Sequence, residues 1–331
     1  MESYVYAHRG SEIENRHRVS LAVVNREGRL LAAGGDPRLL AHLRSSAKPF
    51  QAQALFQSGA MRRFGFGPEE LALAMASHDG TPAHTEIAAR MLERIGLDPS
   101  YLACGVHPPL SRAARRELEA HHQKPTVLHN NCSGKHSGML AVAVALGADP
   151  KGYELPEHPV QQLNFQTVRD LSGVPEVPYG VDGCSVPTFV LPLDRAAWMF
   201  TQLAEPGLAP EKYREGLEAA YRAMRQHPDL IAGPESIDTV LMQRVPGLVA
   251  KRGADGYYGM ALRESKWGPL GIALKVEDGS IAAREPAVVQ LLELLGALHP
   301  GDPLEWRRPP IKNVKGLEVG YYQARLGLTW G

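Results

Sequence analysis

A chain of 331 residues with 44% hydrophobic and 22% charged residues has the composition of an ordinary globular protein, long enough for one large core or two joined lobes. Its 36 Lys+Arg and 36 Asp+Glu residues cancel, so it lacks the basic excess of a nucleic-acid-binding protein, and no apolar run approaches the ~20 residues that span a bilayer. Because it has three cysteines and no secretory signal, we expect a cytoplasmic protein. The charge balance indicates that its partner is a small molecule or another protein, not a nucleic acid, and no membrane partner is expected.

The N-terminal part of the chain is predicted to be β structure, and the middle to be helical. Two short apolar runs, 20–25 and 29–34, are joined by Arg26-Glu27-Gly28, a sequence typical of a hairpin turn. Farther on, apolar residues recur with helical spacing, and Gly or Pro follows several segments. The predicted helices are 46–58, 68–77, 85–95, 112–122, 135–146, 159–171 and 210–225. The segment 135–146 is apolar nearly all round, which indicates a buried central helix.

The C-terminal third returns to strand-like segments. Strands are predicted at 247–251, 257–262 and 270–276, then a helix at 285–298 and a last strand at 321–329. Alternating strand and helix units are missing, and no G-x-G-x-x-G follows a strand. A nucleotide-binding fold is therefore not expected.

Strands at both chain ends with helices between them indicate an α/β (α+β) fold. We expect one mixed, mostly antiparallel sheet built from both ends, with a helical lobe inserted. The prediction is a single catalytic domain over residues 1–331. Its sheet lobe would span about 1–45 and 246–331, and its helical lobe about 46–245.

A Ser-x-x-Lys pair, Ser45 and Lys48, begins the first long predicted helix in the segment RSSAKPF. The spacing puts both side chains on one helix face. A hydroxyl becomes a nucleophile when a nearby base takes its proton, and an amine does this if burial or a neighbouring cation keeps it neutral. The helix N-terminus also offers N–H groups to a developing oxyanion. The motif alone is weak evidence, because Ser is a common N-cap and a first-turn Lys is often a solvated charge.

Two further elements strengthen the catalytic interpretation. Ser77 ends a predicted helix in LALAMASHDG, and Lys251 lies on a predicted strand in Lys251-Arg252-Gly253. Penicillin-binding proteins and serine β-lactamases carry S-x-x-K, a second hydroxyl-bearing motif and a strand K-[ST]-G in the same order. The chain departs from them at Arg252, where they have a hydroxyl residue, and it has no S-x-N motif. The similarity is therefore to the site and the fold, not to β-lactam chemistry.

Two cysteines have distinctive surroundings: Cys132 in NNCSGKHSG and Cys184 in VDGCS. Two thiolates with one or two nitrogen or oxygen ligands would suit Zn²⁺. Lys135, His136 and Asp182 are candidates for the remaining positions, and His136 is the conventional choice because a Lys coordinates only with a lowered pKa. Neither of these two cysteines begins a C-x-x-C or C-x-x-H motif, so inert buried cysteines are the alternative.

Taken together, RSSAKPFQ, ASHDGT, NNCSGKHSGML, YGVDGCSVPTF and AKRGADG resemble the asparaginase II family of the inducible, thermolabile Rhizobium etli type. The resemblance covers the chain from about residue 18 to its C-terminus. It implies a serine β-lactamase-like fold, related in architecture to glutaminases, and a homodimer.

The resemblance also implies roles for individual residues. By matching motif to motif, the catalytic positions are Ser45, Lys48, Ser77 and Lys251. A zinc ion in the family is held by residues that correspond here to Cys132, Lys135 and Cys184, with Asp182 close by. The family thus uses Lys135 where the residues alone favour His136.

From these assignments we expect an L-asparaginase that works by double displacement. Ser45 or Ser77, deprotonated by Lys48, would attack the side-chain amide, and Ser45 is favoured by its helix position. Lys251 would keep Lys48 neutral by charge repulsion or bind the substrate carboxylate. Zinc would orient the substrate.

Asn131, His136 and Asp182 are the candidate substrate contacts. Three alternatives remain open: a metalloamidase in which zinc activates water, an amidohydrolase acting on glutamine or another small amide, and a non-catalytic ligand sensor on the same scaffold.

Overall fold

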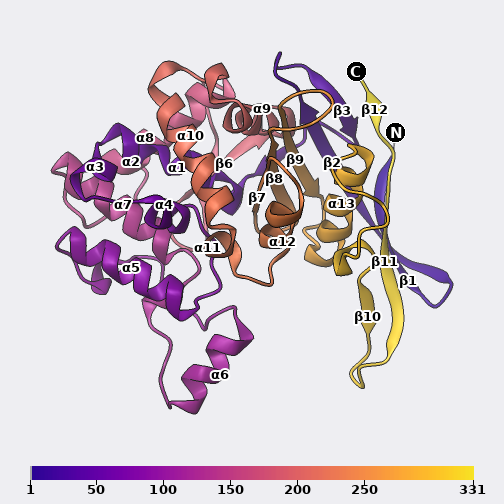
Figure 1. Ribbon diagram of the computed structural model, residues 1–331, viewed down its shortest axis with the longest axis horizontal. Coiled ribbons are helices and arrows are strands. Elements are labelled where there is room, and N and C mark those ends of the chain that lie inside the picture. The colour runs from indigo at the N-terminus through magenta and orange to yellow at the C-terminus, as the bar shows by residue number, and fades with distance from the viewer. Residues whose placement is uncertain (1) are drawn as a thin grey trace. The chain divides into compact units, whose positions relative to one another are not determined.

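The computed structural model describes residues 2–331, drawn as a ribbon in Figure 1. Two compact units are present. The sheet unit takes the chain up to Ser46, Leu191–Glu205 and Arg244–Gly331, and the helical unit takes Ala47–Val190 and Pro206–Gln243. The sheet unit thus includes 191–205, a segment that the sequence assigns to the helical lobe. That the chain acts as one catalytic domain stays a prediction.

The sheet unit contains a nine-stranded sheet built from both chain ends. Its main strand order is β10-β11-β1-β2-β9-β8-β7, with β3 beside β2 and β12 beside β3, and the neighbouring strands are antiparallel. The strands are β1 (Ser3–Arg9), β2 (Glu12–Val24), β3 (Leu30–Gly34), β7 (Leu248–Arg252), β8 (Tyr257–Leu262), β9 (Leu270–Val276), β10 (Pro310–Lys312), β11 (Glu318–Leu326) and β12 (Thr329–Trp330). The α/β class and the antiparallel sheet from both chain ends are confirmed.

The buried strands of this sheet agree best with the prediction. β8 and β9 have the predicted bounds, and the apolar half of β2 pairs with β9 from Val19↔Val276 to Val24↔Gly271. The polar half of β2, from Glu12 on, pairs with β1 and was missed. Its side chains are mostly exposed, so no apolar alternation marks it in the sequence.

Two helices cover opposite faces of the sheet. Successive residues of a strand face opposite sides. Arg284 of α13 (Ile281–Leu294) lies over the ring of Tyr258 at 5.6 Å, whereas Phe200 of α9 (Leu193–Ala204) lies against Gly259. A Cβ atom at Gly271 would overlap the backbone of α9, so the glycine permits this close approach. The result is a helix–sheet–helix arrangement inside the unit.

The start of α13 differs from the prediction of 285–298. Ser280 caps the helix by accepting a hydrogen bond from the backbone N–H of Ala283, so the helix begins one turn earlier, at Ile281. Pro286, which would fall in the first turn of the predicted helix, therefore lies inside the helix that forms.

The helical unit surrounds a buried helix, α7. Its helices are α1 (Lys48–Gln51), α2 (Gln53–Gln57), α3 (Ala60–Arg63), α4 (Pro68–Ala74), α5 (Pro82–Arg94), α6 (Arg112–Ala120), α7 (Ser133–Leu146), α8 (Pro159–Ser172), α10 (Glu211–Gln226), α11 (Pro228–Ala232) and α12 (Ile237–Arg244). The short strands β5 (Tyr179–Val181) and β6 (Pro187–Pro192) pair as an antiparallel hairpin. Every residue of α7 from Ser133 to Ala143 is buried, so the central helix predicted at 135–146 is confirmed.

The helix predicted at 46–58 is wrong as a single element. The chain forms a 3-10 helix, η1 (Arg44–Ala47), then α1 and α2. Pro49 has no backbone N–H and is tolerated only in the first turn, so α1 begins at Lys48 and not at Ser46. Ser45 therefore lies in η1, half-buried, and is not the N-cap of a long helix.

Among residues 2–331, no helix combines the length and the apolar character that crossing a membrane requires.

Candidate functional site

The amine of Lys48 is the centre of a buried polar cluster in the helical unit. Lys48 is only 1% exposed. Its Nζ donates hydrogen bonds to the backbone carbonyl of Ala76, to Ser77 Oγ at 3.0 Å and to Cys132 Sγ at 3.2 Å. The predicted Lys48 and Ser77 are thus in direct contact, within the distance that a proton transfer requires.

The surroundings of Lys48 favour its neutral form. Burial lowers the pKa of the amine most strongly; the neighbouring Cys132 raises the pKa and Lys135 lowers it, and the net direction is downward. An amine with a lowered pKa is more often free to accept a proton at neutral pH.

Ser77 lies just beyond the C-terminus of α4, in an irregular segment. Backbone hydrogen bonds join this segment to two other parts of the chain. The Ser77 N–H donates to Ile231 O at 2.8 Å, and the His78 N–H donates to Asn131 O at 3.2 Å. The ring of His78 is completely buried, with Nε2 2.9 Å from Ser133 Oγ. These bonds hold the backbone that carries the Ser77 hydroxyl. Sequence reasoning missed His78, although it directly follows Ser77.

The N-terminus of α7 carries the second part of the cluster. Cys132 is the N-cap residue, and its N–H donates to Asn130 Oδ1 at 2.8 Å. The thiol of Cys132 is hydrogen-bonded to that of Cys184, which lies between β5 and β6. Lys135 Nζ donates to Cys184 Sγ at 2.9 Å. The structure therefore brings together the three predicted zinc ligands, which come from two segments about 50 residues apart.

The hydrogen bond between the two sulfurs shifts their pKa values in opposite directions. The hydrogen bond with Cys184 is the main cause that lowers the pKa of Cys132 well below its usual value, and it correspondingly raises the pKa of Cys184. Burial alone would lower the pKa of Lys135, but the charges on Cys184, Cys132 and Asp182 outweigh it and raise that pKa. These pKa shifts favour a thiolate at Cys132 beside an ammonium group at Lys135.

Two sulfurs and one amine suit Zn²⁺, which binds soft sulfur and nitrogen donors. Metal binding at these atoms would have to release their protons, so affinity would rise with pH. Residues 2–331 contain no cluster of three or more His, Cys, Asp or Glu side chains placed to hold a metal ion. A metal at this position would therefore depend on the amine of Lys135.

The other two predicted catalytic residues belong to the sheet unit. Lys251 lies on β7, completely buried, and its Nζ donates to the backbone carbonyl of Arg252 at 3.0 Å. Its own carbonyl accepts a hydrogen bond of 2.6 Å from Ser46 Oγ. Ser46 is the neighbour of Ser45 in η1, so it connects this 3-10 helix to the strand that carries Lys251. The sequence does not predict this role of Ser46, because the Ser-x-x-Lys motif involves only Ser45 of the two adjacent serines.

The predicted substrate contacts have different surroundings. Asn131 is held by His107, whose Nε2 accepts from the Asn131 N–H at 3.0 Å. Asp182 is half-buried, and its Oδ1 accepts from the Gly183 N–H at 2.7 Å. His136 is completely buried, with Nδ1 2.5 Å from the hydroxyl of Tyr153, a residue that no sequence motif marks.

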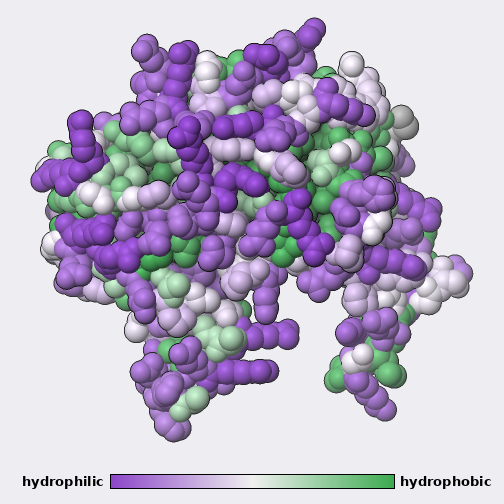
Figure 2. Space-filling model, in the orientation of Figure 1, coloured by the Kyte–Doolittle hydropathy of each residue, from purple (hydrophilic) through white to green (hydrophobic). Residues whose placement is uncertain are grey.

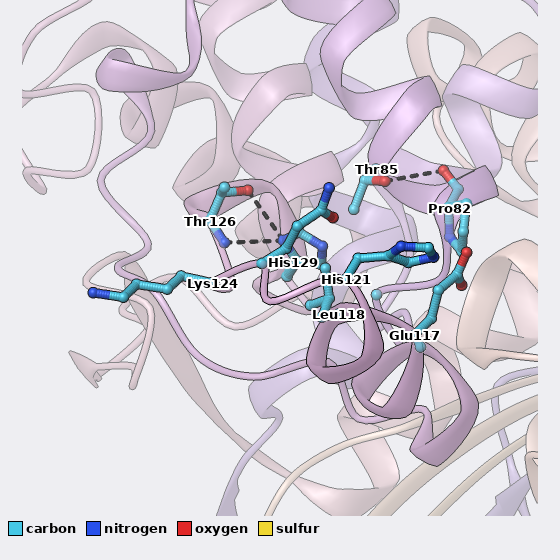
Figure 3. Close-up of a pocket in the computed structure, with 11 residues that line it drawn as sticks. Pro82, Thr85, Glu117, Leu118, His121, Lys124, Thr126 and His129 are labelled. Atoms are coloured by element: carbon cyan, nitrogen blue, oxygen red, sulfur yellow. Dashed lines mark hydrogen bonds between the residues drawn. The ribbon is translucent and has the colours of Figure 1, made fainter.

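A separate cavity of about 650 Å³ opens between α5, α6 and the 3-10 helix η3 (Val127–His129). Figure 3 shows Glu117 of α6 and His121, the residue after α6, extending into it, while Thr126 donates to His129 Nδ1 at 3.0 Å. Only Ala114 of α6 is buried, and the helix is largely hydrophilic in Figure 2. The residues around the cavity include none of the cluster around Lys48, so the cavity is not the candidate catalytic site.

Three solved structures are similar to this chain at low sequence identity. A β-lactamase from Mycobacterium bovis is 14% identical, with a TM-score of 0.44 over 85% of this chain and 95% of that chain. A Bacillus glutaminase is 14% identical, with a TM-score of 0.41 over 84% of this chain and 91% of that one. Mglu, in its tris and glutamate form, is 17% identical with a TM-score of 0.42 over 87% of this chain, which spans 61% of the length of Mglu.

With TM-scores below 0.5, these three structural similarities carry no argument about this chain. A comparison with curated proteins finds no match. The family comparison is decisive, because the model described as L-asparaginase II matches residues 5–324, nearly the whole chain. The chain belongs to the L-asparaginase II family.

Proposed function

We propose that the protein hydrolyses L-asparagine to L-aspartate and ammonia through a serine–lysine centre. Membership of the L-asparaginase II family supports a hydrolase that acts on amides. The observation that carries the mechanism is the 3.0 Å contact between Lys48 Nζ and Ser77 Oγ inside a buried cluster. A serine hydroxyl beside an amine of lowered pKa is the arrangement that activates a serine nucleophile.

In the proposed mechanism, the serine oxygen attacks the carbonyl carbon of the side-chain amide, and its proton passes to Lys48. Collapse of the tetrahedral intermediate breaks the C–N bond, and Lys48 returns the proton to the leaving nitrogen, so ammonia departs and an ester remains. Water then hydrolyses the ester to aspartate and regenerates the serine. The direct contact with Lys48 favours Ser77 as the nucleophile over Ser45, the choice that helix position alone suggests.

We also propose a zinc site formed by Cys132, Lys135 and Cys184, with Asp182 beside it. The mutual contacts of the two sulfurs and the amine support this set. When bound there, zinc would supply a positive charge that orients the substrate and neutralises the sulfur pair. Asn131, His136 and Asp182 are the proposed substrate contacts, and Lys251 is a proposed member of the catalytic set by its family motif.

Ammonia release from L-asparagine and L-glutamine tests the activity. We would compare the wild type with Ser77→Ala and Ser45→Ala, and use Ser58→Ala as the control, because Ser58 Oγ donates only to carbonyls of α2. Release from asparagine that is lost in Ser77→Ala supports the proposal with Ser77 as nucleophile. Loss only in Ser45→Ala transfers that role to Ser45.

Other outcomes contradict parts of the proposal. Release that survives both serine substitutions and ceases on chelation supports the metalloamidase. Faster release from glutamine changes the substrate. No release from either amide refutes the asparaginase activity and leaves the ligand sensor as the better hypothesis.

The family resemblance also leads us to propose a homodimer, which sedimentation of the purified protein tests. The composition supports a cytoplasmic location, and fractionation of cells that express the full chain tests that proposal.

A further inference from the structure

The ring of His136 has one partner and one unpaired nitrogen. It is completely buried on α7, next to Lys135, and packs edge-on against Tyr153 with ring centroids 5.5 Å apart. Nδ1 lies 2.5 Å from the hydroxyl oxygen of Tyr153. Nε2 has no hydrogen-bond partner among residues 2–331. A buried nitrogen without a partner is rare in native proteins and calls for an explanation.

The hydrogen-bond partners of Tyr153 determine which ring nitrogen carries the proton. The Tyr153 oxygen already accepts a hydrogen bond from the Ala103 N–H at 2.9 Å. Its own O–H has a single acceptor within reach in the described structure, His136 Nδ1. If the hydroxyl donates to Nδ1, the ring proton must be on Nε2. The reverse assignment would leave both the Tyr153 O–H and Nε2 unpaired, so it is disfavoured.

This tautomer limits what His136 can bind. Nδ1 uses its lone pair on Tyr153, and Nε2–H has no lone pair, so the ring cannot coordinate a metal ion. It can only donate, and its counterpart must be an oxygen acceptor. The side chains of Lys135 and Lys48 are close enough to interact electrostatically with the ring, so the donor belongs to the neighbourhood of the proposed catalytic cluster. The same argument explains why Lys135, and not His136, is the better candidate ligand.

We propose that Tyr153 fixes the tautomer of His136 so that Nε2–H donates a hydrogen bond to a carbonyl or carboxylate oxygen of the amino-acid amide substrate. Tyr153 is then a positioning residue, and His136 the residue that contacts the substrate. This inference rests on the proposed amidohydrolase function, which names the substrate class.

Nitrogen NMR of ¹⁵N-histidine-labelled protein tests the tautomer directly. The His136 signals are identified by their loss in His136→Gln. We expect the wild type to carry the proton on Nε2, and Tyr153→Phe to show both tautomers, because the donor to Nδ1 is gone. Tyr213→Phe is the matched control, since it also deletes a hydroxyl that donates a 2.8 Å hydrogen bond, to Asp170, but leaves His136 untouched. Saturating L-aspartate, the product, should shift the Nε2 signal.

Two substitutions at His136 test the contact kinetically. Gln places an N–H near the position of Nε2, whereas Asn places one near Nδ1. With L-asparagine, we expect His136→Asn to reduce kcat/KM by about 10- to 100-fold more than His136→Gln, as for loss of a buried hydrogen bond to a substrate oxygen. Thermal unfolding checks that each variant is folded.

Three results would overturn the inference. The first is a proton on Nδ1 in the wild type, and the second is no response of the Nε2 signal to saturating L-aspartate. The third is that His136→Asn is at least as active as His136→Gln, or that both variants are inactive. If the wild type releases no ammonia from any amide, the proposed function fails. In that case the NMR measurements of the tautomer and of the response to L-aspartate still test the inference about His136. They also test it if a variant does not fold.

Discussion

The imidazole Nε2 of His78 and the hydroxyl oxygen of Ser133 lie 2.9 Å apart and join two segments of the candidate site. Ser133 Oγ donates its own proton to Leu128 O at 2.9 Å, so the oxygen accepts the hydrogen bond from His78 Nε2–H. His78 Nδ1 in turn accepts from the Gly80 N–H at 3.2 Å. Through this chain of bonds, the segment that follows Ser77 is held against the first turn of α7.

Ser133→Ala should destabilise the protein by about 1–3 kcal/mol, because it leaves the buried N–H of His78 without an acceptor. The free energy of unfolding in urea measures the effect. Ser11→Ala is the control, since the hydroxyl of Ser11 makes its hydrogen bond to Glu12 on the exposed surface, where such a bond contributes little. Equal effects of the two substitutions would show that the contact between His78 and Ser133 does not stabilise the fold.

The buried histidines His78 and His84 should make the fold sensitive to acid. Their rings are stacked with centroids 4.9 Å apart. Burial is the largest cause that lowers each pKa, and for His78 the charges of His84 and Lys48 add to it. A folded-state pKa below the unfolded value of about 6.5 means that the unfolded chain binds protons first as the pH falls. Stability is therefore unaffected above pH ~6.5 and declines below it, by at most ~1.4 kcal/mol per pH unit for each histidine.

Urea unfolding between pH 8 and pH 5 measures this dependence. Since carboxylates also titrate toward the acid end, the difference between wild type and variant is the useful quantity. His84→Asn keeps an acceptor near the position of Nδ1, which accepts from the Thr81 N–H, and should lose less stability below pH 6.5 than the wild type. The exposed His121→Asn should follow the wild type. A wild-type curve that is flat down to pH 5 would contradict the prediction.

Removal of either of the two proposed sulfur ligands should prevent zinc binding. Purified Cys132→Ser and Cys184→Ser should contain less than about a tenth of the wild-type zinc by elemental analysis, because two remaining donors hold Zn²⁺ weakly. Cys104→Ser is the matched control: it is also a buried free cysteine, and burial raises the pKa of its thiol to about 12, so it stays protonated. Zinc retained in both sulfur variants would refute the proposed ligand set.

The buried elements of the fold could be predicted because they consist of runs of apolar residues. β8, β9 and α7 are examples: each consists almost entirely of buried residues. The polar half of β2 and the helix α9 were not predicted. The first depends on its pairing with β1, and the second lies in a region without a clear start signal, since Pro192 caps it without a side-chain hydrogen bond.

For the candidate site, sequence motifs indicated which residues matter but not how they contact one another. Helix position in the sequence favours Ser45 over Ser77 as the nucleophile. The contact of Lys48 with Ser77 supports the opposite choice, and it forms only because the chain folds Ala76 and Ser77 back onto α1. Tyr153 belongs to no motif, and its importance appears only through the unpaired nitrogen of His136. Long-range contacts of this kind have no local signal in a single sequence.

The close packing of α7 against α4 gives a last prediction, for two glycines one turn apart. A Cβ atom at Gly134 would overlap the backbone carbonyl of Leu73, which cannot move without shifting α4. At Gly138 the nearest atom would be Ala74 Cβ at 3.2 Å, a contact that small adjustments relieve. Both substitutions to Ala improve helix propensity by ~1 kcal/mol, so only the packing differs. Gly134→Ala should cost about 1–3 kcal/mol in the free energy of unfolding, whereas Gly138→Ala should stay within ~1 kcal/mol of the wild type. Because Gly134 precedes Lys135, Gly134→Ala should also lower kcat/KM for asparagine. If Gly134→Ala were as stable and as active as Gly138→Ala, α4 could shift to make room for the methyl group without disturbing the cluster around Lys48.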